Sequence, residues 1–431
     1  MDIQSLYTIF RQYPIVITDS RKVVKDSLFF ALKGANFNGN LFARQALDNG
    51  AAYAVVDELY DQKDDRIILV DDVLLTLQNL SSYHRRILGI PILAITGSNG
   101  KTTTKELTAA VLSKKFNLRY TQGNLNNHIG VPLTLLSLDE STEFAVVEMG
   151  ANHPGEIDFL CRIAQPDFGL ITNVGKAHLE GFGSFEMVIQ TKTEMYQYLA
   201  EKNGHLFINA GNKYLMEAAI DFHAKITYGN EEGVYLRGET LNSGPFLSVR
   251  AWFPSGILYI NTKLIGNYNT ENVLAAAAIG KYFGVDPLVI KEGLETYVPS
   301  NNRSQMIKTQ SNQIIMDAYN ANPSSMQASI HNFVSIDHPS KTLIIGDMLE
   351  LGEYSPFEHQ KIIDLVASSP ICRTFVVGEL FNQCNLPEKC TGFKQVADLA
   401  QYLTVNPITD NLILIKGSRG IGLERVLDVI I

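Results

Sequence analysis

A strand, a glycine loop and a helix follow one another near residue 95, and this order constrains the fold more than any other feature of the sequence. The apolar stretch ILAIT at 92–96 predicts a buried strand, and GSNGKTTT at 97–104 follows it directly. Leu107, Ala110 and Val111 then mark the apolar side of a predicted helix. Two glycines let the backbone curl so that successive N–H groups point at one anion, and the helix dipole adds positive charge there. The pattern predicts a phosphate cradle.

The residues of this loop that we expect to contact a nucleotide are Gly97, Ser98, Asn99, Gly100, Lys101, Thr102 and Thr103. Lys101 would reach the β- and γ-phosphates, and Thr102 would coordinate magnesium. The loop has the form GxxGKT, because Ile95 stands five residues before Gly100, where the general phosphate-loop pattern has glycine. The alternative is a Gly-Asn turn before an unrelated helix, and the flanking strand and helix favour the phosphate loop.

Length and strand spacing predict three domains, because 431 residues exceed the size of one hydrophobic core. Apolar strands that each lead into a helix predict parallel sheets, and they fall in two series. The first is at 92–96, 144–148, 168–172 and 206–209, and the second is near 313 and at 342–346, 374–378 and 412–417. The expected fold is α/β, with a central parallel sheet of the phosphate-loop ATPase type at 90–298 and a C-terminal Rossmann-like sheet at 299–431. Residues 1–89 form a first domain of short strands and helices.

Composition excludes several classes of protein. Hydrophobic residues make up 45% of the chain and charged residues 19%, as in an ordinary folded protein. A formal charge of −9 argues against sequence-independent binding of nucleic acid. No signal peptide or run of 18 apolar residues is apparent, and the four cysteines form no CxxC pair, so we expect no membrane insertion and a reducing, cytoplasmic location.

Two polar residues at predicted strand ends are candidate metal ligands, since ligands of open α/β sheets bind beyond the carboxyl ends of the strands. Glu148 ends FAVVE, and its carboxylate can bind a hard cation that also touches phosphates. The alternative is a solvated or helix-capping acid. His178 follows the strand at 168–172. A lone histidine is more often structural, and magnesium prefers oxygen ligands, so the sequence alone does not make His178 a ligand.

The phosphate loop, Glu148, His178 and GNYNTEN at 266–272 follow one another in this order along the chain. The order is the same as in the Mur ligases, which the chain resembles over essentially its full length. Four further stretches resemble the member that adds D-alanyl-D-alanine: GNLNNHIGVPLT at 123–134, EMGANH at 148–153, DAYNANP at 317–323 and GDMLELG at 346–352. The Asp-Asn-Pro-Arg motif typical of the sibling that adds the third amino acid does not occur.

The resemblance implies a cell-wall precursor ligase that uses ATP and Mg²⁺ to join UDP-N-acetylmuramoyl-tripeptide to D-alanyl-D-alanine. Its three domains would hold the UDP end of the substrate, the ATP and the dipeptide. It places Asp19, Ser20, Arg21, Asn126 and Asn127 with the UDP substrate, Asn272 at adenine, Arg303 and Asp317 at phosphates and ribose, and Asn320 and Asn322 at the dipeptide. Asparagines also form turns and caps, and for Asn322 before Pro323 that alternative remains open.

The resemblance also implies that Lys192 is carbamylated by carbon dioxide and shares a second magnesium with His178. A carbamate reverses the charge of the ammonium and offers the hard oxygens that magnesium prefers. Thr193 follows this lysine where the family more often has a small residue, and the alternative is an exposed helical lysine.

The implied reaction begins when the tripeptide carboxylate attacks the γ-phosphate of ATP, which gives an acyl phosphate. The amine of the dipeptide then attacks the carbonyl, and phosphate leaves. Two alternatives remain: another amide ligase on this scaffold, such as a folate polyglutamate enzyme, and a regulator that uses ATP only as a switch. We expect a monomer; the sequence does not determine the third residue of the tripeptide.

Overall fold

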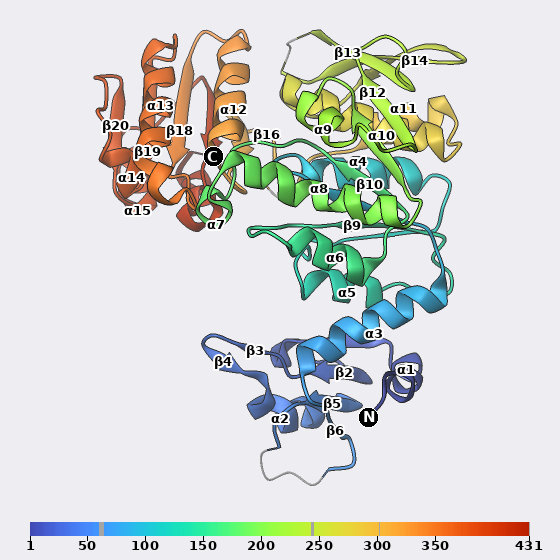
Figure 1. Cartoon of the computed structure of the whole chain (residues 1–431). Coiled ribbons are helices and arrows are strands. Elements are labelled where there is room, and N and C mark those ends of the chain that lie inside the picture. The colour runs from blue at the N-terminus through green and yellow to red at the C-terminus, as the bar shows by residue number, and fades with distance from the viewer. Residues whose placement is uncertain (60–63, 243–244, 301, 431) are drawn as a thin grey trace.

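The computed structural model describes residues 1–59, 64–242, 245–300 and 302–430 and contains three sheets of three or more strands. Figure 1 shows the sheets in sequence order, with the first domain at one end and the third beside the central domain. This arrangement confirms the expected α/β fold with a central parallel sheet and a C-terminal Rossmann-like sheet. Among the described residues, no helix combines the length and the apolar character needed to cross a membrane.

The first domain is a four-stranded parallel sheet in the order β1-β2-β5-β6. Its strands are Ile15–Ile17, Ser27–Phe30, Tyr53–Val56 and Ile67–Leu69, with a small hairpin of β3 (Lys33–Gly34) and β4 (Phe37–Asn38). Helices α1 (Ile3–Gln12) and α2 (Ala43–Asp48) belong to the same domain. The long helix α3 (Val73–Leu88) connects it to the central domain, because one part of α3 packs in the first core and another contacts α5 and α6.

The central domain has nine strands in the order β15-β14-β13-β12-β11-β10-β7-β9-β8. The strands from β8 to β13 are parallel: β7 Ile92–Thr96, β8 Leu118–Tyr120, β9 Phe144–Glu148, β10 Phe168–Ile171, β11 His205–Asn209, β12 Lys225–Gly229 and β13 Leu236–Asn242. Strands β14 (Ser248–Phe253) and β15 (Gly256–Asn261) add an antiparallel ribbon. The apolar runs correctly predicted β7, β9, β10 and β11 to within a residue, whereas the sequence analysis did not predict this ribbon.

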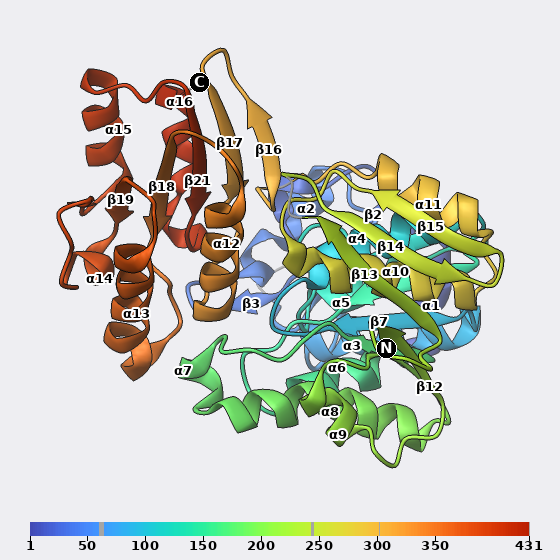
Figure 2. The same ribbon diagram turned by 90° about the horizontal axis from the view of Figure 1, so that it is seen from above.

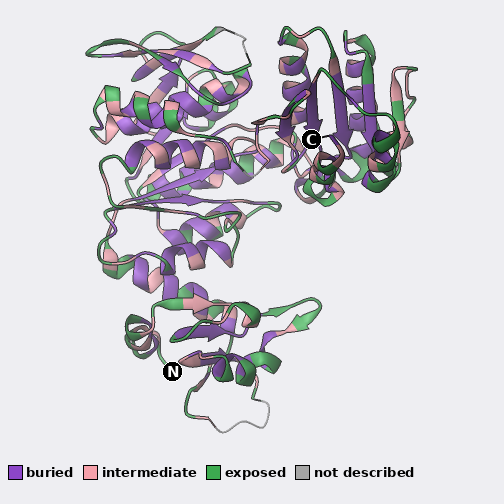
Figure 3. Ribbon diagram, turned by 180° about the vertical axis from the view of Figure 1, so that it is seen from behind, coloured by how far each residue is buried: buried purple, intermediate pink, exposed green. Residues whose placement is uncertain are grey.

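Helices cover both faces of the central sheet, which explains why its inner strands are apolar throughout. One face carries α4 (Lys101–Leu112), α10 (Thr270–Tyr282) and α11 (Pro287–Thr296). The other carries α5 (Gly130–Leu136), α6 (Glu156–Ala164), α8 (Phe185–Glu201) and α9 (Lys213–Ala218), and the short α7 spans Leu179–Phe182. Figure 3 shows the buried residues concentrated along the strands and on the inner sides of these helices.

The third domain has six strands in the order β16-β17-β21-β18-β19-β20, and only β16 runs antiparallel. The strands are Gln305–Lys308, Asn312–Asp317, Lys341–Gly346, Arg373–Val377, Cys390–Phe393 and, for β21, Asn411–Lys416. Helices α12 (Pro323–Ser335), α13 (Ser355–Ser368), α14 (Glu379–Asn382), α15 (Val396–Val405) and α16 (Leu427–Ile430) surround them. Figure 2 shows β16, β17 and α12 on the side that faces the central domain. The carboxyl ends of β17 and β21 thereby lie near the phosphate loop.

Candidate active site

A cleft of about 1460 Å³ lies between the central and third domains. Its central-domain wall is formed where β7, β9, β10, β11 and β12 end, through Ser98, Glu148, Asn173, Asn209 and Gly229. The third domain contributes residues between Arg303 and Ser329 together with Glu350 and Lys416, and α3 contributes Leu74 and Gln78. Ligands of open α/β sheets bind at this edge of a sheet, so the cleft is the candidate active site.

The phosphate loop is held by the neighbouring strand end. The backbone N–H of Ser98 donates to the carbonyl of Asn173 at 3.0 Å, and the Thr172 hydroxyl donates to the carbonyl of Asn99 at 2.6 Å. Gly97 has φ of 142°, and a Cβ there would collide with the Thr172 hydroxyl. Glycine is therefore required at this close approach, and the loop leads directly into the N-terminus of α4.

Lys101, the first residue of α4, folds back over the loop. Its ammonium donates to the carbonyl oxygens of Gly97 at 2.7 Å and Ser98 at 3.4 Å. Burial lowers the pKa of Lys101, and the nearby Glu148 carboxylate opposes that shift. A bound phosphate would supply a stronger partner than these carbonyls, because hydrogen bonds between charged groups are about twice as strong as neutral ones.

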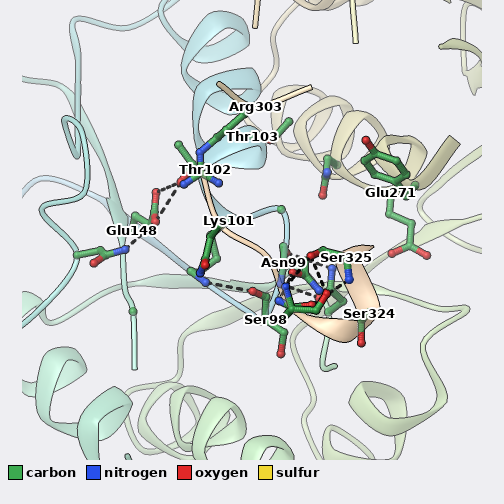
Figure 4. Close-up of a pocket in the computed structure, with 18 of the residues that line it drawn as sticks. Ser98, Asn99, Lys101, Thr102, Thr103, Glu148, Glu271, Arg303, Ser324 and Ser325 are labelled. Carbon is green, nitrogen blue, oxygen red and sulfur yellow. Dashed lines mark hydrogen bonds between the residues drawn. The ribbon is translucent and has the colours of Figure 1, made fainter. Parts of the chain in front are cut away.

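Thr102 and Glu148 meet at the base of the loop (Figure 4). The Thr102 hydroxyl donates to Glu148 Oε2 at 3.0 Å, and the Asn126 amide donates to Oε1 at 2.9 Å. Glu148 is 1% exposed, so its carboxylate is held in one orientation. A hydroxyl and a carboxylate suit Mg²⁺, which usually binds one or two carboxylates and completes its shell with substrate phosphates and water. The two side chains therefore fit a magnesium ion that also contacts a nucleotide.

Lys192 lies on α8 immediately behind the cleft wall. Its side chain is 2% exposed, and its nitrogen donates to the carbonyl of Ala151, a cleft residue, at 3.3 Å. Burial, aided by the positive charge of Lys101, lowers the pKa of Lys192 to about 7. The alternative of an exposed helical lysine is therefore wrong. An amine that is partly neutral near pH 7 is also chemically able to react with carbon dioxide.

His178 precedes α7 in a left-handed conformation, with φ of 51°. Its Nδ1 lies 2.5 Å from Glu350 Oε2 of the third domain, at ion-pair distance, and the proximity of His178 lowers the pKa of Glu350. Within the described part of the chain, no hydrogen bond joins His178 to Lys192. The imidazole lines the cleft and in this arrangement connects the central and third domains.

Asn272 lies in the first turn of α10, against the phosphate loop. Its Oδ1 accepts from the Thr104 hydroxyl at 3.0 Å, and its Nδ2 donates to Asn269 at 2.8 Å. A Cβ on Gly100 would lie 2.6 Å from the same Oδ1, so the loop and α10 are in close contact. The adjacent Glu271 projects into the cleft, where burial and Glu231 raise its pKa (Figure 4). This places Asn272 between the phosphate loop and the part of the cleft beside Glu271.

Arg303 and Asp317 belong to the third domain but line the same cleft. Arg303 lies beside Thr102 and Thr103 in Figure 4, and its guanidinium carbon is 3.7 Å from the centre of the Tyr319 ring. Asp317 accepts from Lys416 Nζ at 2.6 Å and from the Ser329 hydroxyl at 3.0 Å. The structure thus brings both predicted residues into the cleft, with Arg303 beside the phosphate loop.

Asn320 and Asn322 also line the cleft, and their side chains make contacts within the protein. Asn322 Oδ1 accepts from Ser325 N–H at 2.9 Å and caps α12, while its Nδ2 donates to Asn99 at 2.8 Å. Asn320 Oδ1 accepts from the backbone of Ala321 at 2.9 Å. The alternative role of these asparagines, cap and turn formation, is therefore observed: Asn322 caps a helix and Asn320 bonds the adjacent backbone. A dipeptide contact stays a prediction for both.

The residues predicted for the UDP substrate lie in two places. Asp19 caps the short helix Ser20–Lys22 and binds the Arg21 guanidinium, which lowers the pKa of Asp19 to about 2. These three residues, Asp19, Ser20 and Arg21, are not among those that line the cleft, whereas Asn126 and Asn127 are. Asn127 also accepts from the N–H of Gly130 at 2.9 Å. A substrate that contacted both sets would have to extend along α3.

Several charged residues of the site were not predicted from the sequence. Lys105 is fully buried, donates to the Thr121 carbonyl at 2.7 Å and lies 3.7 Å from Glu148 Oε2. Lys416 ends β21 beside Asp317, and Glu350 pairs with His178. Lys416 was detectable, because it follows the apolar run LILI at a predicted strand end. Lys105 carried no such signal, because a lysine within a helix is usually exposed.

Family comparisons agree with this geometry. Residues 12–85 match the family model described as "Mur ligase family, catalytic domain", residues 95–280 the "Mur ligase middle domain" and residues 302–419 the "Mur ligase, glutamate ligase domain". The UDP-N-acetylmuramoyl-tripeptide–D-alanyl-D-alanine ligase of Bacillus subtilis is 35% identical, over 96% of this chain and 92% of the relative. The Escherichia coli enzyme of the same name is 34% identical with the same coverage.

Solved structures show the same architecture. MurF from Acinetobacter baumannii matches with a TM-score of 0.87 and 29% identity, covering 99% of this chain and 97% of that one. MurF from Thermotoga maritima in complex with ADP matches at 0.86 and 26%, covering 97% of both. A folylpolyglutamate synthase from Mycobacterium tuberculosis shares the fold at 0.63 and 14%, over 82% of this chain and 94% of that one. With full-length relatives above 30% identity and family models matched in all three domains, this chain belongs to the Mur ligase family.

Proposed function

We propose that this protein uses ATP to join D-alanyl-D-alanine to UDP-N-acetylmuramoyl-tripeptide and forms the pentapeptide precursor of peptidoglycan. The observation that carries the proposal is the meeting of the phosphate loop and the Thr102–Glu148 pair with third-domain residues in one cleft. The full-length similarity to enzymes with this printed name supports the choice of acceptor. A switch that only binds ATP would not need a third domain at its phosphates.

The chain's own residues account for the first step, the attack of the tripeptide carboxylate on the γ-phosphate of ATP. The ammonium of Lys101 and the N–H groups of the first turn of α4 neutralise the phosphates and orient them. Arg303 adds positive charge from the third domain. Thr102 and Glu148 would hold the magnesium ion, which neutralises phosphate charge when it is bound. The products of this step are an acyl phosphate and ADP.

In the second step the dipeptide amine attacks the acyl carbonyl, the C–O bond to phosphate breaks, and the nitrogen releases a proton. Positioning dominates this step, because the acyl phosphate is already reactive. We assign Asn320 and Asn322 to the dipeptide side, Asn272 to adenine, and Arg303 and Asp317 to the phosphates and ribose. Asp19, Ser20, Arg21, Asn126 and Asn127 serve the UDP substrate.

We also propose that Lys192 carries a carbamate. Its nitrogen attacks the carbon of CO₂ and loses a proton to solvent, which leaves an anion in place of the ammonium. Burial supports this assignment, because an isolated buried charge is costly and a neutral amine can react. The carbamate and His178 would hold a second magnesium once the imidazole is released from Glu350.

The proposed domain limits are 1–89, 90–298 and 299–431, and each matched family model falls inside one of them. The protein would act as a cytoplasmic monomer, with ATP and Mg²⁺ as cofactors.

The test is phosphate release from ATP by the whole protein, with each acceptor alone and with both together. We expect sustained release only when UDP-N-acetylmuramoyl-tripeptide and D-alanyl-D-alanine are both present, with a product that carries both. Release driven by folate and glutamate would favour the polyglutamate alternative, and release independent of any acceptor would favour the switch.

A further inference from the structure

Two guanidinium groups of the third domain share the ring of Tyr319, a residue that lines the cleft. The guanidinium carbon of Arg303 lies 3.7 Å from the centre of the Tyr319 ring, and that of Arg419 lies 5.4 Å from the same point. Arg303 faces the phosphate loop (Figure 4), whereas Arg419 follows β21 in the short helix Arg419–Ile421. The positive charges of Arg303 and Arg419 therefore both lie within 5.4 Å of the same ring centre.

Arg419 has no carboxylate within ion-pair distance among the described residues. The nearest lysine along the chain, Lys416, is neutralised by Asp317 at 2.6 Å. Asp347, in the neighbouring loop, is occupied by the N–H groups of Leu380 and Phe381, each at 2.9 Å. The positive charge of Arg419 thus remains available to a ligand.

The backbone that carries Arg419 is held in place. The Ser418 hydroxyl accepts from the N–H of Leu349 at 3.0 Å, and the N–H of Ser418 donates to the carbonyl of Asp347 at 3.2 Å. Ser418 itself is 3% exposed, although Arg419 is exposed. Preorganised backbone and an aromatic face under the guanidinium reduce the entropy lost when Arg419 binds an anion.

The proposed acceptor, D-alanyl-D-alanine, carries a terminal carboxylate whose negative charge matches the positive charge of Arg419. A dipeptide whose amine must reach the acyl phosphate beside Lys101 and Arg303 carries its carboxylate no more than about 7 Å away, the extended length of two residues. We propose that Arg419 binds the terminal carboxylate of the incoming dipeptide and so selects acceptors with a free C-terminus. This inference rests on the proposed function and assigns a residue that recognises the substrate, separate from Asn320 and Asn322.

The test compares D-alanyl-D-alanine with D-alanyl-D-alaninamide, which keeps the amine and both methyl groups but lacks the terminal negative charge. Phosphate release is measured for each acceptor at saturating ATP and UDP-N-acetylmuramoyl-tripeptide. A charge-assisted hydrogen bond predicts that the wild-type KM is about tenfold to a hundredfold lower for the acid than for the amide. Arg419→Met should raise the KM for the acid by a similar factor and leave the KM for the amide and for ATP unchanged.

Two further variants define the comparison. Arg419→Lys should recover part of the preference for the acid, because it keeps the charge but not the bidentate geometry. Arg425→Met, at an exposed arginine in the next turn (Leu423–Val426), should match the wild type for both acceptors. The assignment is overturned if Arg419→Met keeps the wild-type preference for the acid over the amide. It is also overturned if the variant loses activity equally with both acceptors or has a raised KM for ATP. A wild-type protein that released no phosphate with either acceptor would instead remove the proposed function, and this assignment with it.

Discussion

The phosphate end and the dipeptide end of the cleft are built in different ways. The phosphate end comes from the contiguous residues 97–104, and its contacts to Thr172, Asn173 and Glu148 stay within the central domain. The proposed dipeptide end draws on separate segments of the third domain, near 319–322, 350 and 416–419. One end can form within a single folded domain, whereas the other depends on the approach of two.

Three side-chain contacts join the central and third domains where they meet at the cleft. Asn322 donates to Asn99, His178 pairs with Glu350, and Lys176 Nζ lies 2.9 Å from Glu358 Oε1. Each joins the third domain to the phosphate loop or to the segment that follows β10. Closure of two domains around bound substrates can complete a catalytic site in this way.

Deletion of residues 299–431 should abolish ligation, because it removes the entire dipeptide end together with Arg303 and Asp317. The remaining protein should stay folded, since a separate domain keeps its own core. Exposure of Ile265, which packs in the third-domain core, should lower the Tm by several degrees. Phosphate-release assays and thermal unfolding check both expectations. Full activity in the truncated protein would refute the three-domain account.

Lys101→Ala should reduce ligation by roughly a thousandfold or more, because the ammonium stabilises charge at the transferring phosphoryl group. The Tm should remain near that of the wild type, since its nitrogen bonds only loop carbonyls. Lys114→Ala, at a lysine of the α4 C-terminus that pairs with Glu292, provides the matched control. Substantial turnover by Lys101→Ala would remove the phosphate-loop assignment.

Lys192→Ala should lower activity by on the order of a hundredfold, because it removes the proposed carbamate together with the proposed metal site. Added bicarbonate should not restore turnover, whereas a short-chain carboxylic acid should restore part of it by supplying the missing oxygens. Lys202→Ala, at the exposed end of the same helix, should behave as wild type. Wild-type turnover in Lys192→Ala would rule out both the carbamate and the second metal.

Lys176→Met should have the smallest effect, a rise of about twofold to tenfold in the KM for ATP. Lys176 is 47% exposed, so solvent weakens its ion pair. The Glu358 side chain is 2% exposed and would be left buried with only the more distant Lys361, at 3.9 Å, as a cationic partner. Adding Glu358→Gln removes that buried charge and should recover part of the loss. Steady-state kinetics on both single variants and the double variant give the coupling free energy between Lys176 and Glu358. Additive effects would mean that this pair does not contribute to closure.

The strands and the phosphate loop were predictable because their signals are local. Apolar runs such as FAVVE and TLIIG must be buried on both faces, and the glycines of GSNGKT permit a backbone path that few other residues adopt. The antiparallel ribbon of β13 to β15 was missed. Strand β13 reads LRGETLN, which lacks an apolar run, and its burial comes from α10.

Sequence order by itself determined which residues stand at the carboxyl end of each strand, and therefore that Glu148, Asp317 and Lys416 face a ligand edge. Only the tertiary structure decided which of them meet. Three such contacts join residues from distant segments or from positions without a local pattern. They are Lys105 beside Glu148, His178 beside Glu350, and Arg303 and Arg419 on one tyrosine ring. Their contacts depend on how helices pack on sheets and how two domains approach, and such long-range geometry leaves no periodic signal in the sequence.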